Sequence, residues 1–223
     1  MGSKLPLGKI VDLSVPIKSG ETPVYPGYPK PLRETLTTVT ADGYYSNVWT
    51  LDEHTGTHVD APAHFFENRP SVEEVPLAGT VGRGVVLDFA GRRANYSITR
   101  RDVENGLRDR GLGEKVGRGW IILFHTGYTK FAGTPRWLEH PGLSEDACRF
   151  VASLRVNAVG FDAPSPDRPP FPAHKILLPR GILIFEGLTN LEKVAARDFI
   201  FFGVPLPLVN GSASPVRAFA ILS

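Results

Sequence analysis

Apolar residues gather in short runs along the chain, and the runs differ in how they alternate with polar residues. Mostly apolar runs, as expected for strands buried in a sheet, are found at 84–89, 120–124, 156–161 and 181–188. Residues 10–17 alternate apolar and polar side chains instead, which predicts a half-buried strand that ends or lies at an edge near Pro16. Further strands are expected at 47–53, 199–204, 205–208 and 216–221.

Two other segments have the spacing of amphipathic helices. The first is expected to run from an N-cap at Thr99 to about Arg110, with Val103 and Leu107 on its buried side. The second is expected over 144–154, with a serine as its N-cap. The patterns together predict an α/β or α+β fold, with a mixed sheet curved into a barrel-like core and two or three peripheral helices.

The composition and net charge of the chain bear on how many domains it forms and on what kind of partner it binds. The chain has 223 residues, 42% of them hydrophobic, and no second hydrophobic block behind a linker, so we predict a single domain over 1–223. Its net charge of +2 gives no reason to expect nucleic acid. The arginine doublets at 92–93 and 100–101 are interspersed with acidic residues, which is typical of a solvated helix face.

The single cysteine bears on the cellular compartment. Cys148 has no second cysteine to pair with, so no intrachain disulfide forms, and a reducing cytoplasm fits. Because it falls inside the second predicted helix, we interpret it as a packing residue. Residues 1–4 lack the apolar run of a signal peptide, and no stretch approaches the ~20 apolar residues of a membrane span. We therefore expect a cytoplasmic protein with no membrane partner.

The densest cluster of chemically active side chains lies between residues 54 and 64. Three of the six histidines, His54, His58 and His64, share these eleven positions with Asp60. In a straight strand His54 and His58 would stand ~13 Å apart, too far for one ion. The backbone must therefore fold between them, and Gly56 is the residue that takes positive φ without steric cost. We predict a tight turn or a single helical turn, followed by an extended segment from 60 to 64.

This cluster closely resembles the signature H-x-G-T-H-x-D-x-P-x-H of the cyclase-type metal-dependent hydrolases, the family that includes bacterial kynurenine formamidase and isatin hydrolase. The match is complete from His54 to His64. The resemblance implies a swivelling β/β/α fold. It also implies a first ion held by His54, His58 and Asp60, with His64 as the proton donor and acceptor.

A second half of the site is expected further along the chain. Glu186 ends an apolar strand, where an unpaired buried carboxylate would be expensive and a metal ion would compensate the cost. His174 and Glu186 resemble the family's downstream histidine and glutamate. By that resemblance, His174 holds a second ion, and Asp60 and Glu186 bridge the two.

Histidine and carboxylate ligands without thiolate suit Zn²⁺ or Mn²⁺, and we take Zn²⁺ as the first choice. Two ions ~3.5–4 Å apart share a water and lower its pKa toward ~7, which supplies a nucleophile at neutral pH. The expected reaction is hydrolysis of a small-molecule acyl bond, and the family resemblance implies an amide such as the aryl formamide N-formylkynurenine, a step of tryptophan catabolism. The alternatives are an isatin-like lactam or a lactone at the same centre, and a non-catalytic metal-binding protein. His64 argues against the last, because a structural site needs no free base.

The substrate pocket is expected to be aromatic. The loop 23–29 resembles a family loop that lies over the active site, although the formamidases usually carry Trp and Asp where this chain has Tyr25 and Tyr28. Tyr25 is thus a candidate substrate contact, with simple packing as the other interpretation. The aromatic residues that suggest an aromatic substrate are Tyr25, Tyr28, Trp49, Phe65 and Phe66.

Three further polar residues are not expected to be metal ligands. His140 is expected on a surface loop, Asp162 is expected to order the backbone, and His125 is a weak catalytic candidate. By resemblance to the family, we expect a homodimer or homotetramer.

Overall fold

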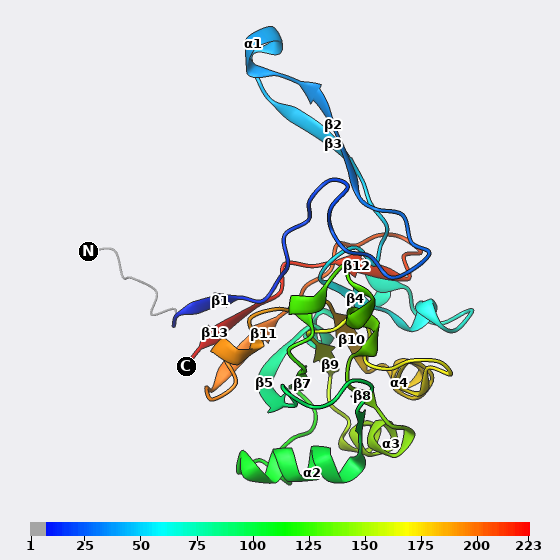
Figure 1. Ribbon diagram of the computed structural model, residues 1–223, viewed down its shortest axis with the longest axis vertical. Helices are drawn as coiled ribbons and strands as arrows, with labels where there is room; N and C mark the ends of the chain where they lie inside the picture. The colour runs from blue at the N-terminus through cyan, green and yellow to red at the C-terminus, as the bar shows by residue number, and fades with distance from the viewer. Residues whose placement is uncertain (1–7) are drawn as a thin grey trace.

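The computed structural model describes residues 8–223, and its centre is a nine-stranded mixed sheet curled into a half-barrel (Figure 1). The strand order is β1-β13-β11-β5-β7-β9-β10-β4-β12. The strands span Ile10–Asp12 (β1), His58–Asp60 (β4), Val81–Asp88 (β5), Trp120–His125 (β7), Ala158–Phe161 (β9), Leu183–Glu186 (β10), Phe199–Phe202 (β11), Ala213–Pro215 (β12) and Phe219–Leu222 (β13).

The four central strands, β5, β7, β9 and β10, run parallel, and antiparallel strands flank them on both sides. Two short pairs lie outside this sheet: β2 (Leu32–Thr37) with β3 (Ser46–Thr50), and β6 (Ser97–Ile98) with β8 (Gly142–Leu143). The mixed, curved sheet with peripheral helices confirms the predicted fold class. The single domain over 1–223 stays a prediction.

Hydrophobic side chains fill both faces of the sheet. One cluster packs between the sheet and the helices α2 (Arg100–Asp109), α3 (Glu145–Leu154) and α4 (Pro172–Leu177). The other lies against the opposite face and includes Leu123, Phe185 and Phe201. The central strands are therefore covered on both sides, as their continuous apolar runs indicate.

The two predicted helices form where their caps place them. Thr99 and Asp102 make a capping box, in which each side chain accepts the other's backbone N–H, and Val103 and Leu107 are fully buried. Ser144 caps α3. The remaining helical segments are α1 (Val39–Asp42) and the 3₁₀ turns at Pro62–His64, Val72–Glu74, Leu77–Gly79, Thr129–Phe131, Pro135–Glu139, Leu178–Arg180 and Leu191–Lys193.

The secondary-structure expectations differ from the structure in several places, and the strand expected at 10–17 ends at Asp12. Residues 205–208 form no strand, because two prolines leave only an isolated bridge from Pro205 to Val216. The strand predicted at 47–53 is Ser46–Thr50, and it pairs only with β2, in a hairpin outside the main sheet. Helix α4 was not predicted, because its six residues are too few for a recognisable period.

No helix within residues 8–223 has both the length and the apolar character needed to cross a membrane. The segment read as lacking a signal peptide lies outside the described residues.

Cys148 is expected to be unreactive in the folded protein. It is completely buried in α3, and burial raises the pKa of its thiol, so little thiolate forms near neutral pH. Titration with a chromogenic disulfide reagent should detect no thiol in the native protein and one after denaturation. Rapid stoichiometric labelling of the native protein would contradict this packing.

Candidate metal centre

The pairing of β4 with β10 creates the centre of the site. His58 stands directly opposite Glu186 in the antiparallel register, and Asp60 lies two residues further along β4. Residues two apart on a strand share a face, and so do cross-strand partners. The three side chains therefore point the same way, although 128 residues separate His58 from Glu186 along the chain.

A tight turn returns His54 to the same place. Gly56 adopts φ +69°, and a β-carbon on Gly187 would lie 2.5 Å from the Gly56 carbonyl oxygen. Thr57 Oγ1 donates to the Gly187 carbonyl over 2.6 Å, which ties the turn to the end of β10. As a result, His54 Nδ1 lies 3.0 Å from Asp60 Oδ1. The turn is where the position of the glycine predicts it.

The segment after Asp60 is not extended as predicted. A 3₁₀ turn spans Pro62–His64, with the proline at its first position, where the missing N–H costs nothing. The turn folds His64 back, so that its ring centre lies 4.2 Å from that of His54 and 5.8 Å from that of His174.

Two carboxylates lie between two histidines. His58 Nε2 is 3.5 Å from Asp60 Oδ1 and 3.3 Å from Glu186 Oε2. His174 Nε2 is 3.6 Å from Asp60 Oδ2 and 3.4 Å from Glu186 Oε1. Each carboxylate thus offers one oxygen to each histidine. Ligands about 2.1 Å from a tetrahedral ion lie about 3.4 Å from one another, so this spacing fits metal coordination.

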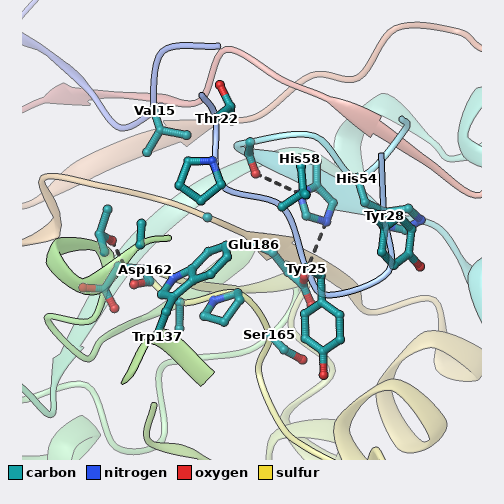
Figure 2. Close-up of a pocket in the computed structure, with 18 of the residues that line it drawn as sticks. Val15, Thr22, Tyr25, Tyr28, His54, His58, Trp137, Asp162, Ser165 and Glu186 are labelled. Carbon is teal, nitrogen blue, oxygen red and sulfur yellow. Dashed lines mark hydrogen bonds and ion pairs between the residues drawn. The ribbon is translucent and has the colours of Figure 1, made fainter. Parts of the chain in front are cut away.

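The buried polar atoms at the centre lack hydrogen bonds. Within residues 8–223, His58 Nε2 and both oxygens of Asp60 are buried without a hydrogen-bond partner. Each such group costs about 1–3 kcal/mol if nothing satisfies it. Figure 2 shows His58 directed at Glu186 inside the pocket. The donor set and its unsatisfied atoms therefore fit a divalent cation.

Acceptors behind His58 and His174 orient their rings. His58 Nδ1 is 3.0 Å from the Gly56 carbonyl oxygen, and His174 Nδ1 is 2.9 Å from Asp167 Oδ1. Both partners only accept, so each Nδ1 carries the hydrogen. When the rings are neutral, as metal ligands must be, the lone pair of each Nε2 then faces Asp60 and Glu186. Such partners fix the ring that ligates a metal.

A side-chain relay gives His54 the complementary orientation. Ser212 Oγ donates to Glu53 Oε2 over 2.8 Å and lies 3.2 Å from His54 Nε2. Because the serine hydrogen is already donated to Glu53, Ser212 accepts from His54 Nε2–H. The Nδ1 lone pair of His54 then faces Asp60. Sequence reasoning missed Glu53 and Ser212, since nothing in the chain order links residues 159 apart.

Electrostatics of the cluster favour positive charge. Burial lowers the pKa of His58, but the nearby Glu186 and Asp60 carboxylates outweigh it and raise the pKa to about 9. Burial also lowers the pKa of His174. The nearby carboxylates of Asp167, Asp60 and Glu186 outweigh this effect, so the pKa of His174 rises well above its usual value. Burial raises the pKa of Asp60, yet the nearby His174 and His54 rings hold it well below its usual range. Protons or metal ions must balance these carboxylates.

His64 has a different environment. Burial lowers its pKa, although the charge of Asp60 opposes this, so the imidazole is neutral at pH 7. One of its ring nitrogens lies within 4.8 Å of the facing atoms of both Asp60 and His54. The ring also lines the cavity, where it can exchange a proton with a bound molecule.

A cavity of about 350 Å³ opens over the cluster, a size that suits a small organic molecule (Figure 2). Tyr25, Tyr28 and Phe65 line it, as sequence reasoning anticipated. Trp49 does not, because it lies on the exposed hairpin, and Phe66 packs against the hydrophobic core. Trp137 and Phe171 form further aromatic walls that sequence reasoning missed.

Three other polar residues lie outside the ligand cluster. Asp162 accepts hydrogen bonds from Thr126 and Gly127, which orders the backbone after β7 as expected. His125 Nδ1 pairs with Asp88 at 3.0 Å. His140 is 1% exposed, so its expected place on a surface loop is wrong. Its Nδ1 donates to the Pro141 carbonyl, and its own carbonyl accepts from Arg168, which makes the burial tolerable.

Comparison with known proteins places these features in context. The model of a family described as putative cyclase matches residues 11–168. A kynurenine formamidase of Salinibacter ruber is 35% identical over 175 residues, which cover 75% of this chain and 76% of that protein. An isatin hydrolase of Roseibium aggregatum is 27% identical over 198 residues, covering 79% and 74%. The solved structure of isatin hydrolase A from Labrenzia aggregata bound to benzyl benzoate superposes with TM-score 0.87 at 26% identity, covering 96% and 93%.

We expect Ser212→Ala to weaken binding of the first divalent ion by about 10–100-fold, because His54 loses the group that orients it. The matched control is Ser153→Ala, whose hydroxyl bonds only within its own helix. Competition with a chromogenic chelator measures both affinities. Equal affinity in the two variants would show that the relay does not act on the ion.

Proposed function

The chain belongs to the putative cyclase family, and from this premise we propose that it is a metal-dependent hydrolase of small-molecule acyl C–N bonds. The observation that carries the proposal is the pair of buried carboxylates, Asp60 and Glu186, set between His58 and His174. A kynurenine formamidase and an isatin hydrolase among the relatives support the same reaction class.

We assign the ligands by their distances. His54, His58 and Asp60 would hold the first ion and His174 the second, and Asp60 and Glu186 would contribute to both. The oxygens of each bridging carboxylate face different histidines, which supports this division. Zn²⁺ is the preferred ion and Mn²⁺ the alternative, because both accept nitrogen and oxygen donors. Such ions polarise a carbonyl group and lower the pKa of water toward ~7.

The chain's own residues then supply the proton transfers and the binding of the substrate. His64, neutral at pH 7, takes a proton from the attacking water at a free ring nitrogen and returns it to the leaving nitrogen. Tyr25 and Phe65 contact the substrate ring from the cavity walls. Asp167, Gly56 and Ser212 keep the three ligand rings in place throughout.

Within this reaction class, we propose an aryl formamide such as N-formylkynurenine as the substrate, which would place the protein in tryptophan catabolism. The aromatic walls and the formamidase relative support this choice. An isatin-like lactam or a lactone is the second candidate, supported by the isatin hydrolase relative. A non-catalytic metal-binding protein is the third, and a half-buried His64 beside the cavity argues against it. We further propose that the enzyme works in the cytoplasm as a homodimer or homotetramer.

We expect His64→Ala to bind metal as the wild type does and to lose ~10²–10⁴-fold in turnover, because only the proton carrier is removed. Elemental analysis and steady-state kinetics give the two readouts. His125→Ala is the matched control, since that imidazole lies outside the ligand cluster. Loss of stoichiometric metal in His64→Ala would instead make His64 a ligand.

We expect N-formylkynurenine to give a higher kcat/KM than isatin or a simple aryl lactone, measured side by side with the metal-loaded enzyme. Prior removal of the metal should abolish every activity. A preference for isatin or the lactone would favour the second candidate. Absence of turnover on all three substrates by fully loaded protein would favour the non-catalytic one.

A further inference from the structure

A second cavity lies outside the metal centre, at one edge of the main sheet. Its volume is about 440 Å³, and it opens beside β1, the outermost strand on that side, which lies next to β13 (Figure 1). Its walls come from residues 9–12 and from Asn190, Lys193, Arg197 and Leu222. None of these residues lines the cavity over the metal centre. The second cavity is therefore a separate place with its own chemistry.

Cationic side chains dominate the walls of this second cavity. Lys9, Lys193 and Arg197 all line it, and all three are exposed. The ion pairs that lysine and arginine side chains form within residues 8–223 do not include any of the three. Like charges around one cavity repel one another, and an anion that enters relieves the repulsion. The cavity therefore favours a negatively charged occupant.

The acidic residue in the walls, Asp12, does not cancel this charge. Arg217 Nε and Nη2 donate to Asp12 Oδ1 and Oδ2 over 2.9 Å and 2.7 Å. These hydrogen bonds lower the pKa of the Asp12 carboxyl, although burial opposes them. The carboxylate is thus ionised, and the Arg217 guanidinium matches its charge. The charges of Lys9, Lys193 and Arg197 are left uncompensated by it.

Backbone N–H groups along β1 add further donors. Leu13 N donates to the Ala218 carbonyl, so the odd-numbered residues of β1 are those that bond β13. The N–H groups of Ile10 and Asp12 therefore point the other way, to the free edge of the sheet. On that edge the Asp12 carbonyl accepts from Asn190 Nδ2, and Asn190 lines the cavity. The free edge of β1 thus borders the cavity.

Lys193 is positioned before any ligand binds. Its Nζ donates to Asn190 Oδ1 over 2.7 Å, while Asn190 Nδ2 donates to the Asp12 carbonyl over 2.9 Å. These two bonds tie the 3₁₀ turn Leu191–Lys193 to β1 across the cavity. An ammonium that is already held at the wall loses less side-chain entropy when it contacts a ligand.

We propose that this cavity binds a small anion that carries at least two negative charges, such as a phosphate monoester or a dicarboxylate. Arg197 offers the planar donor pair that suits phosphate and carboxylate oxygens, and Lys9 and Lys193 act as point charges. Nucleic acid is a poorer occupant, because it needs cations spread along many phosphates rather than gathered at one cavity. The proposal does not depend on the hydrolase assignment.

Calorimetric titration of the metal-loaded full chain, freed of excess metal, with inorganic phosphate at about pH 8 tests the proposal. Phosphate then carries about two charges, and we expect a Kd of about 1 mM or tighter. The double variant Lys193→Gln/Arg197→Gln should weaken binding by at least about 30-fold, because it removes two charge-assisted contacts. The matched control is Arg101→Gln/Lys115→Gln, which removes the same charge from exposed residues outside the cavity. This control should bind phosphate as the wild type does.

Succinate and acetate show which feature of the anion is recognised. Tighter binding of phosphate than of succinate would identify a phosphate-bearing ligand, and the reverse order would identify a dicarboxylate. Acetate, with one charge, should bind at least about 10-fold more weakly than the better of the two. An anion bound at the metal centre would still bind to Lys193→Gln/Arg197→Gln, so binding that survives in this variant overturns the proposal. It is also overturned if neither phosphate nor succinate binds the wild type, or if the control variant loses as much affinity.

Discussion

The main constraint on this structure is that two carboxylates are buried close together and need positive charge beside them. Asp60 is 1% exposed and Glu186 is 6% exposed, and the two lie close enough to share His58 and His174 as neighbours. Desolvating such groups is costly unless opposite charge lies within a few ångströms. Protonated His58 and His174, whose pKa values are raised, supply that charge, and in the proposed enzyme divalent ions would supply it instead. The strands, turns and hydrogen-bond acceptors around the cluster hold the histidines and carboxylates in position.

The topology of the sheet, rather than any single bond, brings the charged groups of the cluster together. Pairing of β4 with β10 places His58 opposite Glu186 and makes their separation a property of the backbone. Gly187 then lets the ligand turn approach the end of β10 more closely than a side chain would permit, and Gly56 supplies the positive φ of that turn. Acceptors behind each ring set the tautomer, so the lone pairs converge on one volume. The site is thus organised before any ion binds, which lowers the entropy cost of coordination.

The sequence predicted those elements and site residues whose pattern lies within a few neighbouring positions. The capped helices at Thr99 and Ser144, and the continuous apolar strand at 120–124, depend on neighbours within a few residues. The segment 54–64 likewise contains the glycine that makes its turn. His174 and Glu186 were assigned to the same site only through the family resemblance. Ser212, Trp137 and Phe171 reach the site only through tertiary folding and have no local pattern. Trp49 was misplaced for the opposite reason, because aromatic character does not reveal which surface a strand faces.

The hairpin formed by β2 and β3 lies, along the chain, between two segments that build the site. Strand β2 begins three residues after the loop 23–29, whose Tyr25 and Tyr28 line the cavity, and β3 ends four residues before His54. The hairpin is therefore inserted between a pocket wall and a ligand turn, and its two strands are hydrogen-bonded together at the base. This pairing restricts the freedom of both segments. A short exposed loop would leave them less restrained, because the ends of a mobile connection add conformational entropy that binding must then remove. The pairing of β2 with β3 therefore helps to hold a site whose ligand spacing must be precise.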